Sequence, residues 1–261
     1  MKKHCTVNGV DICYDECGPE NGIPVMLIHG LTSSKESMYC LRNVLQDTYR
    51  VYSIDTRGHG ESQRIENYTL EDHGHDMVAF AQTVCPAKPV IIGLSMGSYI
   101  ALRAMEVNPD AFLKGVLIGT KGKGSESSVN RILREMGLDK EKMSDFRIKM
   151  FGMKLAFAPG SGIMPKIRAA RYRGVALTPE EKASEERSLK DFDNLERASQ
   201  VTCPVMVVSG EYDKINPPEL GKEVADAIPG AQYVLFKNGG HMMIAEKPKE
   251  FAKLLEEFIA R

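Results

Sequence analysis

The sequence lacks the features of several classes of protein. No run of about 18 consecutive apolar residues occurs among its 261 residues, so the sequence predicts no membrane-spanning helix. The formal net charge is only −1, so nothing in the overall charge points to nucleic acid or an anionic membrane as a partner. The first residues lead into polar sequence instead of the apolar core of a signal peptide. We therefore expect a soluble, cytoplasmic protein with neither a nucleic acid nor a membrane partner.

Cysteine patterns typical of metal or disulfide sites are also missing. No two of the six cysteines form a CxxC pair, and no group of cysteines and histidines has the spacing of a zinc site. None lies in a sharp strand-to-helix turn, which disfavours a cysteine nucleophile. We expect free thiols in a reducing compartment and neither a metal nor a cofactor. The six are Cys5, Cys13, Cys17, Cys40, Cys85 and Cys203.

Short apolar runs alternate with helical patterns along most of the chain. This alternation predicts a mostly parallel sheet that is covered by helices on both faces. From residue 120 to residue 199 no strand pattern appears, and methionine-rich helical stretches alternate with glycine and proline. We therefore predict a core of residues 1–119 and 200–261 with an inserted helical lid over 120–199. The predicted strands are two around the turn at Asn8-Gly9, followed by 24–28, 50–54, 90–92, 112–119, 205–208 and 233–236.

One motif stands between a predicted strand and a predicted helix. Gly93-Leu94-Ser95-Met96-Gly97 follows the apolar run 90–92 and precedes a helical pattern over 98–105. In this context G-x-S-x-G is typical of a nucleophile elbow, in which a sharp turn holds the serine hydroxyl out and its crowded surroundings require glycine on either side. A glycine-rich turn with an incidental serine is the alternative interpretation.

A serine nucleophile needs a base, and the base needs an acid to orient it. Asp213 follows the predicted strand 205–208, and His241 follows the last predicted strand. Ligands gather at the carboxyl ends of the strands in such sheets, and the order Ser…Asp…His is the one expected with this elbow. Glu211 is a rival acid that we interpret as a surface charge. No carboxylate lies at 119–122, which is the other place where an acid can occur.

The other histidines are weaker candidates for the base. His29 and His59 belong to other loops, and His4 is near the beginning of the chain. His73 and His75 lie on a predicted helix, where we expect solvated side chains.

Two backbone N–H groups should bind the negative oxygen that forms when an acyl group is attacked. Met96 directly follows the proposed nucleophile and supplies one. Leu31 lies in the loop after the strand 24–28 and is the candidate for the other. Its side chain can also serve ordinary packing, and both roles are compatible.

Together these motifs resemble the α/β-hydrolase fold family, in particular the lid-bearing serine hydrolases that include carboxylesterases, enol-lactonases and C–C bond hydrolases. The resemblance implies acyl transfer by Ser95, His241 and Asp213, and a chiefly structural loop over 55–62. A serine nucleophile argues against a haloalkane dehalogenase. The residues that carry the resemblance are His29-Gly30, Asp55-x-Arg57-Gly58-His59-Gly60-x-Ser62, Gly93-x-Ser95-x-Gly97, Asp213 and Gly240-His241.

The substrate remains open at this point. We expect a small-molecule carboxylic ester or lactone; a C–C bond hydrolase of ring-cleavage products and a ligand receptor on a hydrolase fold are the alternatives. Residues 121–173 carry 13 Lys and Arg against 5 Asp and Glu, a balance of +8, which either favours an anionic substrate or is a solvated surface. The methionines and phenylalanines of the predicted lid either line an adaptable apolar pocket or form the core of the lid. They are Met136, Met143, Met150, Met153, Met164, Phe146, Phe151 and Phe157. The sequence predicts no oligomeric state.

Overall fold

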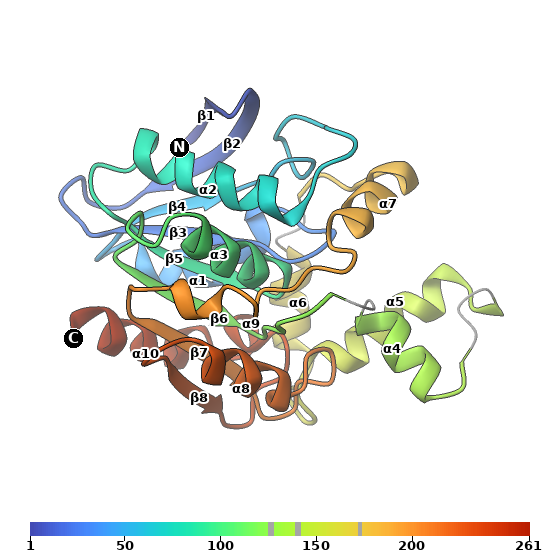
Figure 1. Cartoon of the computed structure of the whole chain (residues 1–261). Coiled ribbons are helices and arrows are strands. Elements are labelled where there is room, and N and C mark those ends of the chain that lie inside the picture. Colours follow the sequence, from blue (N-terminus) through green and yellow to red (C-terminus); the bar gives the residue numbers. More distant parts are fainter. Residues whose placement is uncertain (125–127, 139–141, 172–173) are drawn as a thin grey trace.

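The computed structural model describes residues 1–124, 128–138, 142–171 and 174–261 (Figure 1). Within this part of the chain, eight strands form one sheet in the order β1-β2-β4-β3-β5-β6-β7-β8. The first three strands of that order pair antiparallel, and β4 through to β8 pair parallel. The prediction of a mostly parallel sheet is therefore confirmed. The strands are β1 (Lys2–Val7), β2 (Val10–Cys17), β3 (Pro24–Ile28), β4 (Arg50–Ile54), β5 (Val90–Leu94), β6 (Lys114–Ile118), β7 (Val205–Gly210) and β8 (Gln232–Phe236).

The central strands are mostly apolar because both of their faces are covered. Every residue of β3, β5, β6 and β7 is buried, as expected of parallel strands between two helical layers. Met26 and Ile28 of β3 join one core cluster, whereas Val25 and Leu27 join the other. Alternate side chains of one strand thus enter opposite layers.

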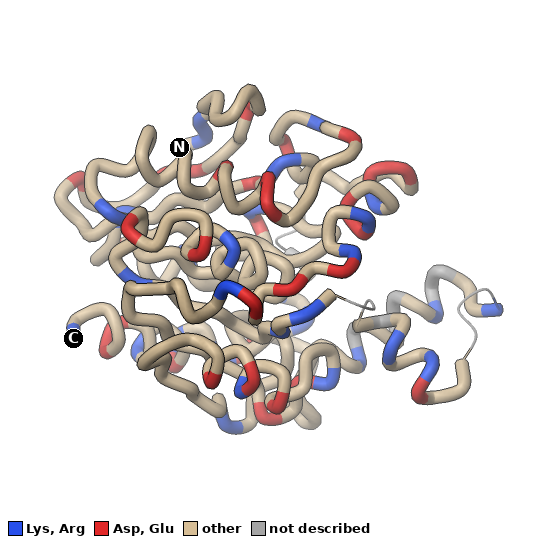
Figure 2. The backbone as a smooth tube through the Cα atoms, in the orientation of Figure 1, with Lys and Arg blue, Asp and Glu red and all other residues tan. Residues whose placement is uncertain are grey.

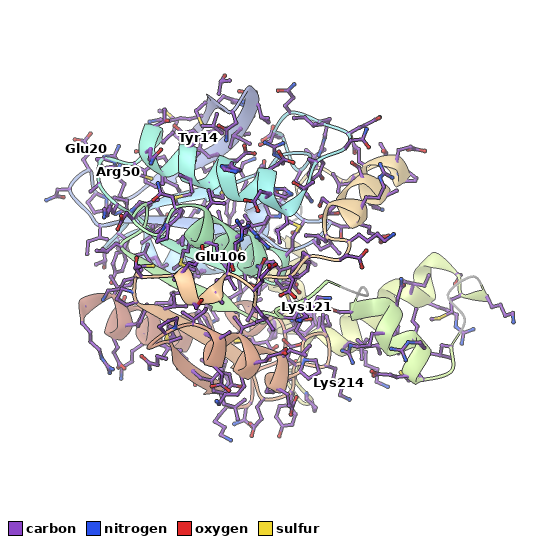
Figure 3. All side chains as sticks on the ribbon, viewed as in Figure 1. Tyr14, Glu20, Arg50, Glu106, Lys121 and Lys214 are labelled. Carbon is purple, nitrogen blue, oxygen red and sulfur yellow. The ribbon has the colours of Figure 1, made fainter. Side chains whose placement is uncertain are left out.

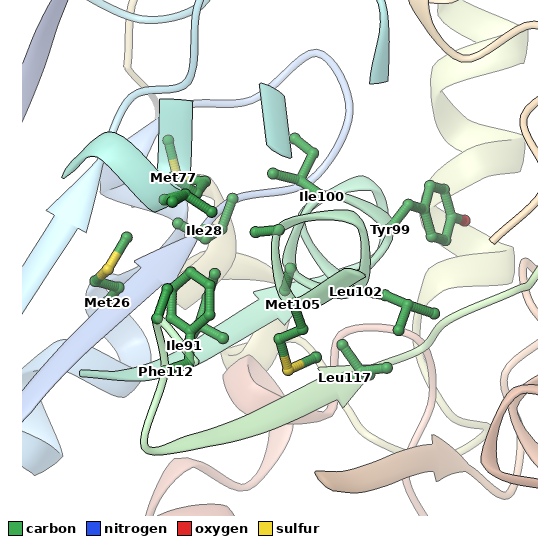
Figure 4. Close-up of a cluster of buried hydrophobic side chains, with 14 of the residues drawn as sticks. Met26, Ile28, Met77, Ile91, Tyr99, Ile100, Leu102, Met105, Phe112 and Leu117 are labelled. Atoms are coloured by element: carbon green, nitrogen blue, oxygen red, sulfur yellow. The ribbon is translucent and has the colours of Figure 1, made fainter. Parts of the chain in front are cut away.

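The two layers hold different helices. The first contains α2 (Leu70–Val84), α3 (Met96–Val107) and α8 (Pro218–Ala227), and Figure 4 shows its apolar side chains around α3. The second contains α1 (Tyr39–Leu45), which follows the 3₁₀ helix η1 (Lys35–Met38), together with α9 (Met243–Glu246) and α10 (Pro248–Ala260). Thr69 precedes α2 and forms a capping box with Asp72, since the Thr69 hydroxyl accepts the Asp72 N–H and the Asp72 carboxylate accepts the Thr69 N–H.

Four α-helices lie between β6 and β7 in the described residues: α4 (Ser128–Glu135), α5 (Asp145–Ala156), α6 (Met164–Arg171) and α7 (Pro179–Ser188). We call residues 120–199 the insertion; its boundaries stay a prediction. The short helix η3 (Ala198–Gln200) then leads towards β7. In Figure 1, α4 and α5 project away from the sheet, whereas α7 lies against the body of the molecule. Figure 2 shows Lys and Arg along the projecting part, and Figure 3 shows Lys121 and Lys214 on the side of the core from which it leaves.

The methionines of the insertion do not share one environment. Met136 is 56% exposed and Met164 is 63% exposed, so neither belongs to an apolar core. Phe157 is buried. The side chains of Phe146, Met150 and Met153 lie outside the described residues. The interpretation of these residues as a core of the lid is therefore wrong for Met136 and Met164, and the alternative that they line a pocket stays a prediction.

No helix in the described ranges combines the length and the apolarity that crossing a membrane requires.

Candidate active site

Ser95 lies in a strained turn between β5 and α3. Its backbone has φ 54° and ψ −119°, a conformation that a residue with a side chain rarely adopts. A Cβ atom on Gly93 would lie 2.0 Å from the Gly97 carbonyl oxygen, and one on Gly97 would lie 2.3 Å from that of Ile28. The turn therefore tolerates no side chain at either glycine, which is the crowding that the G-x-S-x-G pattern predicts.

Asp213 and His241 face each other beyond the ends of β7 and β8. The His241 Nδ1 atom lies 2.7 Å from Asp213 Oδ2, and both residues are buried. Asp213 Oδ1 accepts the backbone N–H groups of Ile215 and Asn216, each at 2.9 Å. Because these bonds hold the carboxylate, and because it accepts the Nδ1 proton, the imidazole presents Nε2 to the opposite side.

Ser95 and His241 lie on either side of the end of β6. The Ser95 N–H donates to the Ile118 carbonyl oxygen at 2.8 Å. The next residue, Gly119, lies against the His241 ring, and a Cβ atom there would be 3.0 Å from Nδ1 and 3.2 Å from Asp213 Oδ2. Gly119 belongs to the segment 119–122, the other place where an acid can occur. Here it carries no side chain and packs against the His241–Asp213 pair.

The loop after β3 lies beside the same serine. Ile28 is paired with Gly93 in the sheet, so the residues that follow each of them leave the sheet together. A Cβ atom on Gly30 would lie 3.5 Å from the Ser95 Cβ. Leu31 is half-buried and packs against the first core cluster. Met96 is the first residue of α3, where a backbone N–H has no partner within the helix. Both predicted oxyanion donors therefore belong to segments next to Ser95.

A model of the α/β-hydrolase family matches residues 25–254 of the chain. The chain belongs to the α/β-hydrolase family. A relative in Mycobacterium tuberculosis described as putative non-heme bromoperoxidase BpoC is 25% identical, over 96% of this chain and 98% of that protein.

Solved structures of the family share this fold. The enol-lactonase from Burkholderia xenovorans LB400 has a TM-score of 0.84 at 24% identity, covering 99% of this chain and 100% of its own. A thermophilic esterase from Thermogutta terrifontis has a TM-score of 0.82 at 23% identity, covering 100% and 98%. At this level of identity the likeness concerns the fold, and the chemistry has to be argued from the residues of this site.

Tyr99 and Asn216 support the site, and sequence analysis did not find them. The Tyr99 hydroxyl accepts a hydrogen bond from Asn216 Nδ2 at 2.7 Å, and the Ser95 side chain is close enough to influence its pKa. Asn216 also donates to the Gly119 carbonyl oxygen at 2.6 Å. Burial raises the pKa of Tyr99, so the hydroxyl stays neutral. The available signal was the position of Tyr99 in the first turn of α3, directly after the Ser95 turn.

His29 and His73 lie outside the predicted site and are completely buried, and burial lowers the pKa of each. His29 Nδ1 lies 2.8 Å from the Gly30 carbonyl oxygen, and its Nε2 accepts the Thr56 N–H at 3.2 Å. Burial lowers the pKa of His29 to about 3. This ring therefore ties the loop after β3 to the loop after β4.

His73 is the second of these, and the expectation that it is solvated was wrong. It has no exposed surface, neither ring nitrogen has a hydrogen-bond partner among the described residues, and burial lowers its pKa well below the usual value. The reason is its place in α2: Leu70, His73 and Met77 lie on one face at helical spacing, and that face covers the sheet. His75 points away from this face, with a side chain that is 57% exposed, as expected.

A buried lysine at the start of η1 links the same loops. Lys35 is 1% exposed, and its Nζ atom lies 2.8 Å from Asp55 Oδ2 and 2.8 Å from Glu61 Oε2. Asp55 also accepts the backbone N–H groups of Lys35 and Glu61. The loop over 55–62 is therefore held by charge, which gives a physical basis for the structural role that the family resemblance implies.

The ligand atoms of Cys13, Asp55 and Glu61 all lie within 4.8 Å of one another, which is close enough to hold a metal ion. Their surroundings do not suit one. The ammonium group of Lys35 already lies between the two carboxylates, and burial raises the pKa of the Cys13 thiol to about 11. We interpret this cluster as an ion pair with its own internal cation.

Removing the Glu61 charge should cost stability above pH 4.5 but not in acid. The Lys35 and Lys2 ammonium groups lower the pKa of Glu61 from 4.5 to about 2. The contribution of the Glu61 charge to the free energy of unfolding is therefore complete above pH 4.5 and is lost as the pH falls towards 2. Because the side chain is 36% exposed, solvent screening limits the effect to about 1 kcal/mol. Urea unfolding at pH 7, 5, 4 and 3 should show Glu61→Gln less stable than wild type at pH 7, with the difference shrinking in acid.

The matched control is Glu20→Gln, because that side chain is exposed. It should give the wild-type profile. A Glu61→Gln difference that stays constant across this pH range would contradict the proposed charge interaction.

Proposed function

We propose that the chain is a carboxylic-ester hydrolase that works through a covalent acyl-enzyme, with Ser95 as nucleophile, His241 as base and Asp213 as the acid that orients it. The observation that carries the proposal is the hydrogen-bonded His241–Asp213 pair, 2.7 Å between Nδ1 and Oδ2, at the strand end that borders the strained Ser95 turn. The substrate is a small-molecule ester or lactone, and the reaction uses no cofactor. The cytoplasmic location stays a prediction.

In the first half of the reaction, Ser95 Oγ attacks the ester carbonyl carbon and its proton passes to His241 Nε2. The carbonyl oxygen becomes negative and is bound by the N–H groups of Leu31 and Met96. The bond to the alcohol then breaks, and His241 gives its proton to the departing oxygen. Asp213 stabilises the imidazolium form while the proton is held.

In the second half, water replaces the alcohol. His241 removes a proton from the water as its oxygen attacks the acyl carbon, and the same two N–H groups bind the new oxyanion. Collapse of this intermediate breaks the bond to Ser95 Oγ, which recovers its proton from His241. The carboxylic acid leaves and the enzyme is restored.

The experiment is a series of p-nitrophenyl esters from acetate to decanoate. We expect turnover with an optimum at one acyl length, because a pocket of fixed depth binds one chain best. In parallel, a fluorophosphonate probe should label the protein at Ser95, which peptide mass spectrometry can locate. Labelling without any ester turnover would instead favour the C–C bond hydrolase or receptor alternatives. Absence of both would overturn the proposed nucleophile.

A further inference from the structure

Glu185 is a carboxylate from the insertion that lies inside the core. It belongs to α7, and its side chain has no exposed surface. One carboxylate oxygen, Oε1, accepts the backbone N–H of Thr32 at 2.7 Å and also contacts His59 Nε2. These partners are 153 and 126 residues away in the sequence. A helix of the insertion therefore reaches two loops at the carboxyl edge of the sheet.

The first of those loops carries a candidate oxyanion donor. Thr32 directly follows Leu31, and its φ of 52° is one that a residue with a side chain rarely adopts. A backbone in this region needs support from its surroundings. The hydrogen bond from the Thr32 N–H to Glu185 is such a support, and it acts one residue from the Leu31 N–H.

The second loop leads back to the same place. His59 Nδ1 lies 2.9 Å from the Arg57 carbonyl oxygen and 3.1 Å from Thr56 Oγ1. Thr56 in turn donates its N–H to His29, whose ring contacts the Gly30 carbonyl oxygen. Glu185 thus contacts the end of the loop 29–32 directly, at Thr32. It reaches the beginning of that loop indirectly, through His59 and Thr56.

A purely structural contact between α7 and the core would not need this carboxylate. The second oxygen, Oε2, is buried and has no hydrogen-bond partner among the described residues. Burying a charged group that is only partly satisfied costs free energy, and an apolar side chain of similar volume fills such a space at less cost. What an apolar side chain cannot do is accept the Thr32 N–H.

We propose that Glu185 is a positioning residue for the oxyanion hole: it holds the Leu31 N–H in place through Thr32 and so makes the hole complete only while α7 is docked. This inference rests on the proposed function, since it needs an oxyanion to form at Ser95. It makes the insertion part of the catalytic apparatus and not only a cover for the substrate.

The test compares three variants on the best p-nitrophenyl ester. Glu185→Leu removes the acceptor and should lower kcat by about 10- to 100-fold, less than deletion of an oxyanion donor, with KM within about threefold of wild type. Glu185→Gln keeps an oxygen for the Thr32 N–H and should retain kcat within about threefold. Glu181→Gln is the matched control on α7.

Glu181 suits this purpose because it ties the same helix to the core elsewhere. Its carboxylate lies 3.3 Å from Arg64 Nε and accepts the Thr178 N–H in a capping box. Glutamine preserves the cap and removes only the ion pair. This variant should therefore keep wild-type kcat.

The inhibition constant of a transition-state analogue measures binding of the oxyanion, which a contact that only docks α7 on the core would not change. The hydroxyl of Ser95 adds to the carbonyl carbon of an alkyl trifluoromethyl ketone. The C–O bond forms, the carbonyl π bond becomes an oxyanion and the serine proton goes to His241. The inhibition constant of Glu185→Leu should rise by the same factor by which its kcat/KM falls, because both depend on binding that oxyanion.

Several results would overturn the proposal. Wild-type kcat in Glu185→Leu, an increase of KM alone, or an equal loss in Glu181→Gln would each show that Glu185 does not act on the oxyanion. If Glu185→Leu does not fold, Glu185→Asp is used, which keeps the charge but withdraws the carboxylate by one methylene; it should lower kcat, and wild-type kcat would again overturn the proposal. A wild-type protein without fluorophosphonate labelling or turnover would overturn the proposed function itself, whereas an active wild type with an unaffected Glu185→Leu would overturn only this inference.

Discussion

Ser95→Ala should lower kcat/KM for any ester that the protein hydrolyses by between about 10⁴- and 10⁶-fold, the range seen when one member of such a triad is removed. Without Oγ no acyl-enzyme forms, so only binding and the oxyanion donors remain to act on water. Fluorophosphonate labelling should disappear as well. The unfolding curve in urea should stay close to that of wild type, because alanine fits where serine does and Ser95 is a surface-accessible residue at the edge of the core.

Ser209→Ala is the matched control for this result. Ser209 is a buried serine of β7 whose hydroxyl has no hydrogen-bond partner among the described residues. Its loss should leave both turnover and labelling unchanged. Wild-type turnover in Ser95→Ala would show that another group attacks the substrate, and the assignment of all three residues would then fall.

Lys35→Met should destabilise the protein by about 3–5 kcal/mol, the usual cost of removing one partner from a buried ion pair. Methionine fills the volume of the lysine stem, so packing changes little. Asp55 has no exposed side-chain surface, and without the ammonium group its charge would be compensated only by backbone N–H groups. Equilibrium urea unfolding at pH 7 measures the difference.

Two further variants separate charge from packing. Lys249→Met changes an exposed lysine and should shift the unfolding free energy by less than about 0.5 kcal/mol. The double variant Lys35→Met/Asp55→Asn removes both charges and should recover part of the stability that Lys35→Met loses. A double variant less stable than Lys35→Met would show that the loss comes from packing or from other hydrogen bonds of Asp55.

Local pattern was sufficient for most of the elements. The predicted strands 24–28 and 50–54 coincide with β3 and β4, and Asn8-Gly9 is the turn between β1 and β2. The predicted strand 112–119 is longer than β6, which spans Lys114–Ile118. Phe112 precedes the strand and is buried in the first core cluster. Because Phe112 is apolar and buried like a strand residue, the sequence pattern extended the predicted strand into the loop before β6.

The grouping of Ser95, Asp213 and His241 could be predicted because it follows from topology. Parallel strands end at one edge of the sheet, so residues in the segments that follow β5, β7 and β8 meet there regardless of their distance in sequence. The family match over residues 25–254 supports the same fold. The catalytic roles of the three residues stay a proposal that the Ser95→Ala experiment tests.

By itself, the sequence determined the strand and helix order, the strained turn at Ser95 and the edge of the sheet at which the site lies, because each follows from local periodicity or from strand ends. Only the tertiary structure decided that Lys35 is buried between two carboxylates, that His73 is an internal residue, and that Glu185 reaches Thr32 from the insertion. These side chains are polar, and nothing local distinguishes them from solvated ones. Their environment depends on segments far away in the sequence, which only folding brings into contact.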